Sequence, residues 1–177
     1  LIAGLDKPTT GQLIMDGVDV TGMPVQKRTI AMVYQQFINY PNLSVFENIA
    51  SPLRILGLKD SVINKRVREV ASILRIGEFL QRLPLELSGG QQQRVAVARA
   101  ISGNPSIILA DEPTGNLDSK NAQVVMSLLD RLHDQGATIC MVTHDPRSAE
   151  RADRTIEVFD GKIVSDQLTE KNQALVL

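Results

Sequence analysis

The chain has 177 residues, 43% of them hydrophobic, a length and composition that suit one folded domain and exclude a disordered chain. Its 19 Lys and Arg balance 20 Asp and Glu, so the net charge gives no general attraction to nucleic acid or anionic lipid. The single cysteine cannot form an internal disulfide, and no apolar run approaches the roughly 20 residues needed to span a bilayer.

The first part of the chain predicts short elements and one buried strand. Residues 1–5 are typical of the last turn of a helix, and turn-forming residues follow them. Residues 12–20 carry apolar side chains on both sides of an Asp-Gly pair, a strong hairpin signal. Residues 29–35 (Thr-Ile-Ala-Met-Val-Tyr-Gln) predict a buried strand that ends at Gln35.

The next segment, residues 37–84, predicts helices. Ser44 is placed to cap a helix that begins near Val45, with Glu47 at the spacing of a capping box. A second, amphipathic helix is predicted by apolar residues spaced four, three and four apart, which are Ile63, Val67, Val70 and Leu74. Three basic residues off that face are interpreted as a solvated surface, namely Lys65, Arg66 and Arg68.

After Pro84 strands alternate with helices, which predicts an α/β fold with a mostly parallel sheet. The expected elements are a helix at residues 91–101, a strand at 106–110, a helix at 122–135, a strand at 137–142 and a hairpin at 155–165. Cys140, inside an apolar strand, is expected in the core. Ligands of such sheets bind beyond the carboxyl ends of the strands, where polar residues stand: Gln35, Asp111, Glu112 and His144.

Asp111 and Glu112 are the strongest candidates for catalytic and metal-binding residues. One of two adjacent carboxylates can hold Mg²⁺ through water while the other orients or deprotonates an attacking water. The Gln35 amide can contact both a metal shell and a water, and His144 can donate to a phosphate oxygen. The residues alone leave plainer interpretations open: an acidic turn, a polar strand end and a structural histidine.

Residues 87–91 (Leu-Ser-Gly-Gly-Gln) predict an anion site. Ser88 can cap the following helix, Gly89 and Gly90 allow a ligand to approach the backbone, and the helix N-terminus offers free N–H groups. These features suit a phosphate, and an ordinary capped helix fits them too. Asp118 follows the carboxylates closely enough to share their site, although aspartate is also common in turns.

Together these segments resemble the ATP-binding-cassette ATPases. Residues 87–91 match the family signature letter for letter, and residues 107–112 resemble its Walker B strand with the catalytic glutamate. Gln35 resembles the Q-loop glutamine, residues 116–118 (Asn-Leu-Asp) the D-loop, and His144 the H-loop. All five segments stand in the family's order and near its spacing.

The resemblance implies a site for ATP and Mg²⁺. Asp111 would hold Mg²⁺ through water, Glu112 would act on the attacking water, and His144 would contact the γ-phosphate. Gln35 would sense the metal and the γ-phosphate and link the site to a membrane partner. The nucleotide of a second cassette, facing head to tail, would meet the signature residues and the D-loop aspartate: Ser88, Gly89, Gly90, Gln91 and Asp118.

The resemblance also implies the architecture and the partners. Residues 1–177 would form one truncated nucleotide-binding domain, with a P-loop-NTPase-like sheet and a helical subdomain inserted at residues 37–84. It would couple ATP binding and hydrolysis to transport, at the cytoplasmic face of a membrane. Its partners would be a second cassette, in a homo- or heterodimer, and a transmembrane permease, but no nucleic acid.

One feature of the family does not occur in the sequence: the phosphate-binding loop Gly-x-x-x-x-Gly-Lys-Ser/Thr. In relatives it precedes the segment that matches residues 1–5, together with a central strand and an aromatic residue that stacks on adenine. We therefore expect this chain alone to bind ATP poorly and not to turn it over. The alternative function is a non-catalytic remnant that donates its signature motif to a complete partner cassette.

The two halves of the chain resemble different classes of cassette. Residues 31–49 resemble sugar and polyol importers, whereas residues 111–119 and 141–146 resemble macrolide and lipoprotein exporters, with the transition between Leu87 and Ala110. The DNA-repair and chromosome ATPases are excluded because they insert very long coiled coils before the signature. Translation-factor cassettes carry two cassettes per chain, and a single cassette argues against them.

Overall fold

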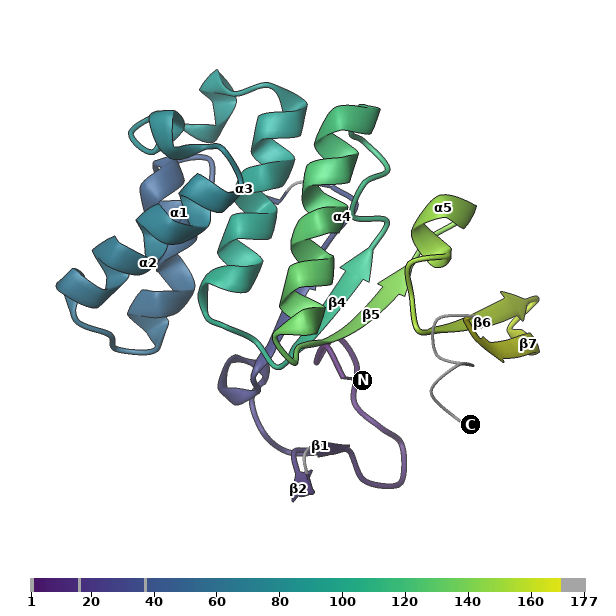
Figure 1. Ribbon diagram of the computed structural model, residues 1–177. Helices are drawn as coiled ribbons and strands as arrows, with labels where there is room; N and C mark the ends of the chain where they lie inside the picture. Colours follow the sequence, from purple (N-terminus) through teal and green to yellow (C-terminus); the bar gives the residue numbers. More distant parts are fainter. Residues whose placement is uncertain (1, 16, 37, 170–177) are drawn as a thin grey trace. The chain divides into compact units, whose positions relative to one another are not determined.

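The computed structural model describes residues 2–15, 17–36 and 38–169 (Figure 1). They form two compact units, which divide between Met141 and Val142. Among these residues we find no helix with the length and apolar character that crossing a membrane requires.

The first unit is built on a sheet with the strand order β3-β4-β5. The strands are β3 (Ile30–Val33), β4 (Ile107–Asp111) and β5 (Thr138–Val142). β3 and β4 run parallel, with Ile30 opposite Ile107 and Val33 opposite Ala110. The predicted α/β fold with a parallel sheet is thus confirmed.

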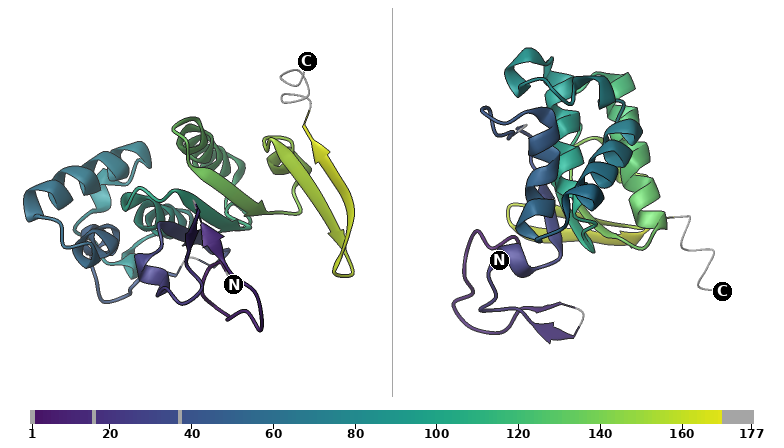
Figure 2. Two further views of the ribbon diagram at one scale, coloured as in Figure 1. Left: turned by 90° about the horizontal axis from the view of Figure 1, so that it is seen from below. Right: turned by 90° about the vertical axis from the view of Figure 1, so that its left-hand side faces the viewer.

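Four long helices accompany the sheet: α1 (Val45–Ile55), α2 (Asp60–Ile73), α3 (Gly89–Ser102) and α4 (Ser119–Asp134). α3 and α4 cover one face of the sheet, and α1 and α2 pack beside α3 (Figures 1 and 2). The largest fully buried side chains come from both layers and include Ile49, Ile63, Leu74, Ile101, Ile108 and Leu128.

α1 begins where its capping residue predicts, whereas α3 begins at Gly89 and α4 at Ser119, two and three residues before their predicted starts. The Ser44 hydroxyl accepts the Glu47 N–H at 3.2 Å, which confirms the cap of α1, while the Glu47 carboxylate binds the Arg54 guanidinium at 2.9 Å. The predicted amphipathic helix is α2, whose buried residues include Ile63, Val67 and Val70. Short 3₁₀ turns link the elements: η1 (Val25–Lys27), η2 (Gly77–Phe79) and η3 (Pro84–Glu86).

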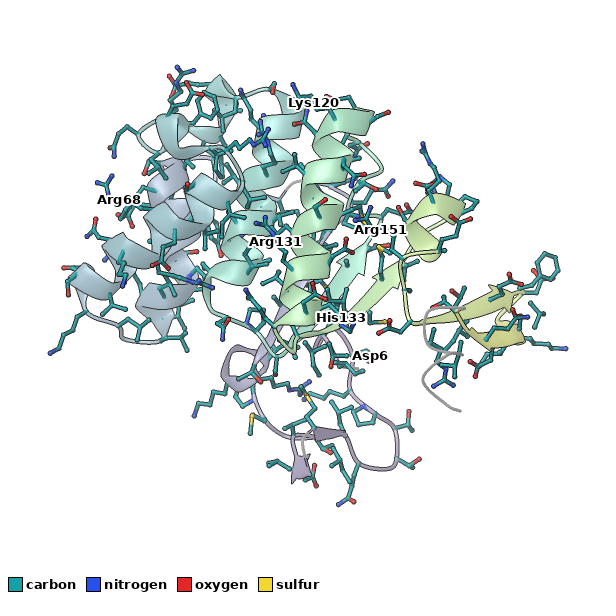
Figure 3. All side chains as sticks on the ribbon, in the orientation of Figure 1. Asp6, Arg68, Lys120, Arg131, His133 and Arg151 are labelled. Atoms are coloured by element: carbon teal, nitrogen blue, oxygen red, sulfur yellow. The ribbon has the colours of Figure 1, made fainter. Side chains whose placement is uncertain are left out.

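The interpretation of the basic residues on α2 is correct for two of the three. Lys65 and Arg68 are exposed, and Arg68 extends from the outer surface of α2 in Figure 3. Arg66 is half-buried instead, and its guanidinium donates to the carbonyl oxygens of Ser102 at 3.0 Å and Ile101 at 3.3 Å. These carbonyls lie at the end of α3, where the Ile101 oxygen also accepts the Asn104 N–H at 3.1 Å, so Arg66 adds a side-chain cap to that helix.

The expectation that Cys140 lies in the core is wrong, because its side chain is exposed. Successive side chains of a strand point to opposite faces. Ile139 and Met141 pack against the hydrophobic core, which turns Cys140 between them to the other face of β5.

The N-terminal segment differs in part from its prediction. Residues 2–6 form turns and bends rather than a helical turn, with Gly4 in the left-handed conformation at φ 72°. The predicted hairpin is confirmed in β1 (Ile14–Met15) and β2 (Val18–Asp19), which pair antiparallel; Asp16 of its turn lies outside the described residues.

The second unit contains α5 (Pro146–Ala149) and the hairpin of β6 (Arg154–Phe159) and β7 (Lys162–Leu168). The two strands pair antiparallel, as predicted, with a register shift between Glu157 and Val158. The Arg154 guanidinium holds the Asp166 carboxylate across the strands at 2.6 Å.

Candidate functional site

The carboxyl end of β4 carries the two candidate carboxylates. Asp111 is the last residue of the strand and is exposed, and Glu112 follows it, half-buried. Glu112 has φ 44°, in the left-handed region that residues other than glycine rarely adopt. The chain therefore turns out of the strand direction directly after Asp111, in the kind of backbone conformation that recurs at functional sites.

Gln35 lies beside this turn. A Cβ built on Gly115 would stand 3.5 Å from the Gln35 Nε2 and 3.6 Å from the Glu112 Cβ, so all three residues share one small space. The Asn116 amide donates to the Gln35 carbonyl oxygen at 2.9 Å, and the Gly115 N–H donates to the Glu112 carbonyl oxygen at 3.1 Å. The structure thus brings the predicted Q-loop glutamine and the predicted catalytic glutamate together.

The register of the sheet explains this proximity. Val33 of β3 pairs with Ala110 of β4, and both strands run in the same direction. Residues that follow the two strands consequently emerge at the same edge of the sheet, where ligands of parallel sheets bind. Gln35 and Glu112 each stand two residues beyond this last pair.

The signature segment forms the start of α3. The Ser88 N–H donates to the Gln91 Oε1 at 2.9 Å, and the Gln91 N–H donates to the Ser88 hydroxyl at 3.4 Å, which together make a capping box. Gly89 and Gly90 are the first residues of the helix, so their N–H groups have no acceptor within it. The hydrogen bonds of Ser88 and Gln91 fix the conformation of the helix N-terminus. This end carries the positive pole of the helix dipole.

Asp118 caps α4 with both carboxylate oxygens. Oδ1 accepts the Asn121 N–H at 2.9 Å, and Oδ2 accepts the Asn121 amide at 2.6 Å. These hydrogen bonds, the backbone one first, lower the pKa of Asp118, and the charge of Lys120 adds to them. Lys120 stands on the first turn of α4 in Figure 3. The plainer interpretation of Asp118, a residue that ends a turn, accounts for these contacts, and its interface role stays a prediction.

His144 belongs to the second unit and precedes α5. It is exposed, and the neighbouring Asp145 caps α5 by accepting the Arg147 N–H at 3.2 Å. The Arg147 side chain is the main cause that lowers the pKa of Asp145. The Asp145 N–H in turn donates to the Thr143 hydroxyl at 3.1 Å, so residues 143–145 form a defined turn. A role for His144 at a phosphate stays a prediction.

Among the described residues no group of three or more His, Cys, Asp or Glu is placed to hold a metal ion. Mg²⁺ does not require such a group, because it keeps several waters and takes one or two protein oxygens together with phosphate oxygens. The exposed Asp111 carboxylate and the Gln35 amide oxygen, at one edge of the sheet, are ligands of that kind.

Sequence reasoning missed Gln93, which is buried with 1% of its side chain exposed. Its Nε2 donates to the Pro113 carbonyl oxygen at 3.0 Å and to the Tyr34 carbonyl oxygen at 3.4 Å. The sequence did contain a sign that Gln93 is buried. It stands on α3 four residues before the buried Val97, and this helical spacing places it on the same face, where an apolar residue is expected.

Asn48 was missed in the same way. It is fully buried on α1, and its Nδ2 donates to the carbonyl oxygens of Leu43 at 2.9 Å, Tyr40 at 3.0 Å and Ser44 at 3.0 Å. Its Oδ1 accepts the Tyr40 N–H at 2.8 Å. One side chain therefore holds residues 40–44 against α1.

Two hollows on the helices lie away from these residues. One, of about 440 Å³, is lined by Arg68, Arg75 and Glu78 among others. The other, of about 330 Å³, is mostly apolar and includes Leu53, Leu56, Leu58 and Val62. Neither is lined by a candidate site residue.

Comparison with known proteins identifies similar chains. The family model described as ABC transporter matches residues 1–115. The spermidine/putrescine import ATP-binding protein PotA of Thermotoga maritima is 42% identical over 166 residues, which are 93% of this chain and 45% of that protein. The macrolide export ATP-binding/permease protein MacB of Brucella melitensis is 41% identical over 172 residues, 94% of this chain and 27% of that protein.

A solved structure is similar over nearly the same region. The dimeric ATP-binding cassette MJ0796, in a post-hydrolysis state bound to ADP and Pi, has a TM-score of 0.83 at 36% identity and covers 93% of this chain and 75% of that one. The chain spans less than half the length of the two relatives above. Importers and exporters both occur among the relatives, in agreement with the predicted likeness to both classes.

Proposed function

Because this chain belongs to the ABC transporter family, we propose that it is a nucleotide-binding subunit that couples ATP binding and hydrolysis to transport across a membrane. The observation that carries the proposal is the proximity of Gln35 and Glu112 at the carboxyl edge of the sheet. Glu112 directly follows Asp111, the last residue of β4. An amide and two carboxylates at this edge supply two kinds of group that phosphoryl transfer to water uses, ligands for the metal ion and a residue that positions the water.

In the proposed reaction each residue has its own task. Glu112 orients the attacking water and accepts its proton. Asp111, through water, and Gln35 would hold Mg²⁺, which when bound would neutralise charge on the phosphates. His144 is assigned the donation of a hydrogen bond to the γ-phosphate. Gln35 also reports the state of this site to the segment that follows it.

We assign the signature segment to a nucleotide held by a second cassette. The helix start at Gly89 and Gly90 offers N–H groups and a positive pole, both suited to phosphate. The proposal is supported by the dimeric state of the similar cassette MJ0796. A two-fold dimer would place two such composite sites in one interface, with Ser88, Gln91 and Asp118 lining it.

The membrane partner is proposed to contact the surface that follows Gln35. Large apolar side chains are exposed in this segment, Ile38 at 50% and Tyr40 at 49%, and further ones are exposed at the end of α1, Ile55 at 69% and Leu56 at 57%. Exposed large apolar side chains suit contact with a partner. Ile38 and Tyr40 stand three and five residues after the Q-loop glutamine, which supports coupling between transport and hydrolysis.

The test is ATP hydrolysis by the natural gene product that carries these residues, isolated with its membrane partner. Glu112→Gln is expected to lower kcat by about 10²–10⁴-fold with KM for ATP nearly unchanged, since it removes the base and keeps the shape. The matched control is Glu157→Gln, which neutralises an exposed carboxylate of β6. It is expected to leave both kcat and KM unchanged.

Activity that survives Glu112→Gln would refute the assignment of the base. A gene product without activity of its own that restores hydrolysis to a complete second cassette would establish the alternative, a non-catalytic signature donor. The polypeptide of these 177 residues alone, whose sequence lacks the phosphate-binding loop, is expected to show no turnover.

A further inference from the structure

We propose that Gln93 is a positioning residue that holds Gln35 and Glu112 in register with the signature helix α3. This inference rests on the proposed function, because it assigns Gln93 a part in the same ATPase site. Gln93 is the fifth residue of α3, the helix that begins with the signature glycines, and its side chain is buried.

The contacts of Gln93 reach the two segments that carry the site. Its Nε2 donates to the carbonyl oxygen of Pro113 at 3.0 Å, and Pro113 directly follows Glu112. The same Nε2 donates to the carbonyl oxygen of Tyr34 at 3.4 Å, and Tyr34 directly precedes Gln35. A single amide therefore ties the ends of β3 and β4 to α3.

The orientation of this amide is set by chemistry. Both neighbours are carbonyl oxygens, which only accept hydrogen bonds, so the NH₂ group of Gln93 has to face them. The Oε1 atom then points the other way, where it is buried and has no partner among the described residues. Burying an amide oxygen without a donor costs free energy. Packing alone would thus favour an apolar residue here, and the two carbonyl contacts are what glutamine adds.

Other contacts make the arrangement rigid. Asn116 donates to the Gln35 carbonyl oxygen at 2.9 Å, so the Gln35 segment is held from the loop after β4 as well as from α3. Small displacements of catalytic groups lower rates steeply. A movement of α3 when the signature engages a nucleotide would be passed through Gln93 to both Gln35 and Glu112.

The experiment compares two adjacent glutamines in the natural gene product, isolated with its membrane partner. Gln93→Met keeps the length and volume of the side chain and removes its N–H donor. Gln92→Met is the matched control. The Gln92 Nε2 donates at 3.1 Å to the carbonyl oxygen of Leu87, which directly precedes the N-cap of α3, and to neither strand end. The readouts are kcat and KM for ATP, the melting temperature, and amide hydrogen exchange of residues 34–36 and 112–116.

We expect Gln93→Met to lower kcat by about 10- to 100-fold, with KM within about twofold of wild type, as misplacement of catalytic groups predicts. Exchange should rise in both strand-end segments and stay unchanged on α4. Gln92→Met should match wild type in kcat, KM and exchange at those segments. If Gln93→Met fails to fold, Gln93→Ala is measured by the same readouts.

Unchanged exchange at residues 34–36 and 112–116 would overturn the inference, whatever happens to the rate. A fall in melting temperature with an unchanged kcat would also overturn it, since Gln93 would then serve stability alone. If the wild-type gene product hydrolyses no ATP, the proposed function fails separately, and the exchange readout still decides whether Gln93 positions the two strand ends.

Discussion

Gly90 lies against Asn121, so that a Cβ on Gly90 would come within 3.3 Å of the Asn121 Nδ2. The N-terminal turns of α3 and α4 are thereby in contact, and the Asn121 amide cannot move away freely because it donates to Asp118 at 2.6 Å. The predicted signature and D-loop segments are therefore mechanically linked within one chain.

Gly90→Ala should consequently fail to stabilise the chain, although alanine favours a helix over glycine by about 1 kcal/mol. The gain is offset because the new methyl group presses on an amide that Asp118 holds. Gly77→Ala is the control, since a Cβ there meets nothing within 4 Å. Urea unfolding measures both variants, and a Gly90→Ala chain more stable than Gly77→Ala would contradict the contact.

Asp118 should give the chain a pH-dependent stability through its cap of α4. Its pKa lies below the ordinary value of 3.8 because Asn121 donates two hydrogen bonds to the ionised form. A carboxylate whose pKa is lowered by folding stabilises the folded chain above its unfolded pKa, and this stabilisation is lost as the pH falls through the lower folded value.

The measurement is the melting temperature of wild type and Asp118→Asn between pH 7 and pH 2.5. Asparagine keeps a cap acceptor and removes the charge. We expect wild type to melt higher at pH 5–7 by a constant margin that shrinks below pH 3.8. A margin that persists unchanged at the lowest pH would show that the charge of Asp118 contributes nothing.

Local patterns predicted much of this molecule, whereas contacts between distant segments escaped them. The caps at Ser44 and Ser88 were predictable because their partners stand three residues away. Gln93 was not, since its acceptors lie 20 and 59 residues away in the sequence. Arg66 was misinterpreted for the same reason, because the carbonyl oxygens that it caps belong to another helix.

Asn48 is expected to be among the residues most sensitive to substitution outside the site. Asn48→Ala removes four hydrogen bonds in a fully buried position and frees residues 40–44 from α1. Because it removes a fully buried side chain that links the Tyr40 N–H and the Leu43 carbonyl oxygen to α1, we expect a loss of about 2–4 kcal/mol in the free energy of unfolding.

The matched control for this prediction is Asn64→Ala on α2. Asn64 is exposed and makes one hydrogen bond, from its Nδ2 to the Asp60 carbonyl oxygen at 2.9 Å. Its substitution should change the free energy by less than about 0.5 kcal/mol, as is usual at the surface. Equal losses for the two variants in urea unfolding would argue against the role of Asn48.

Cys140 should react with a thiol reagent in the folded chain, since its side chain is exposed on β5. An apolar run predicts a strand but not which of its faces is covered, and here Ile139 and Met141 take the covered face. Because the sequence contains one cysteine, Cys140→Ser is expected to abolish the reaction entirely. The measurement is the rate of labelling of the 177-residue chain with and without denaturant. Similar rates in both conditions would confirm the exposure, whereas labelling that requires unfolding would place Cys140 in the core after all.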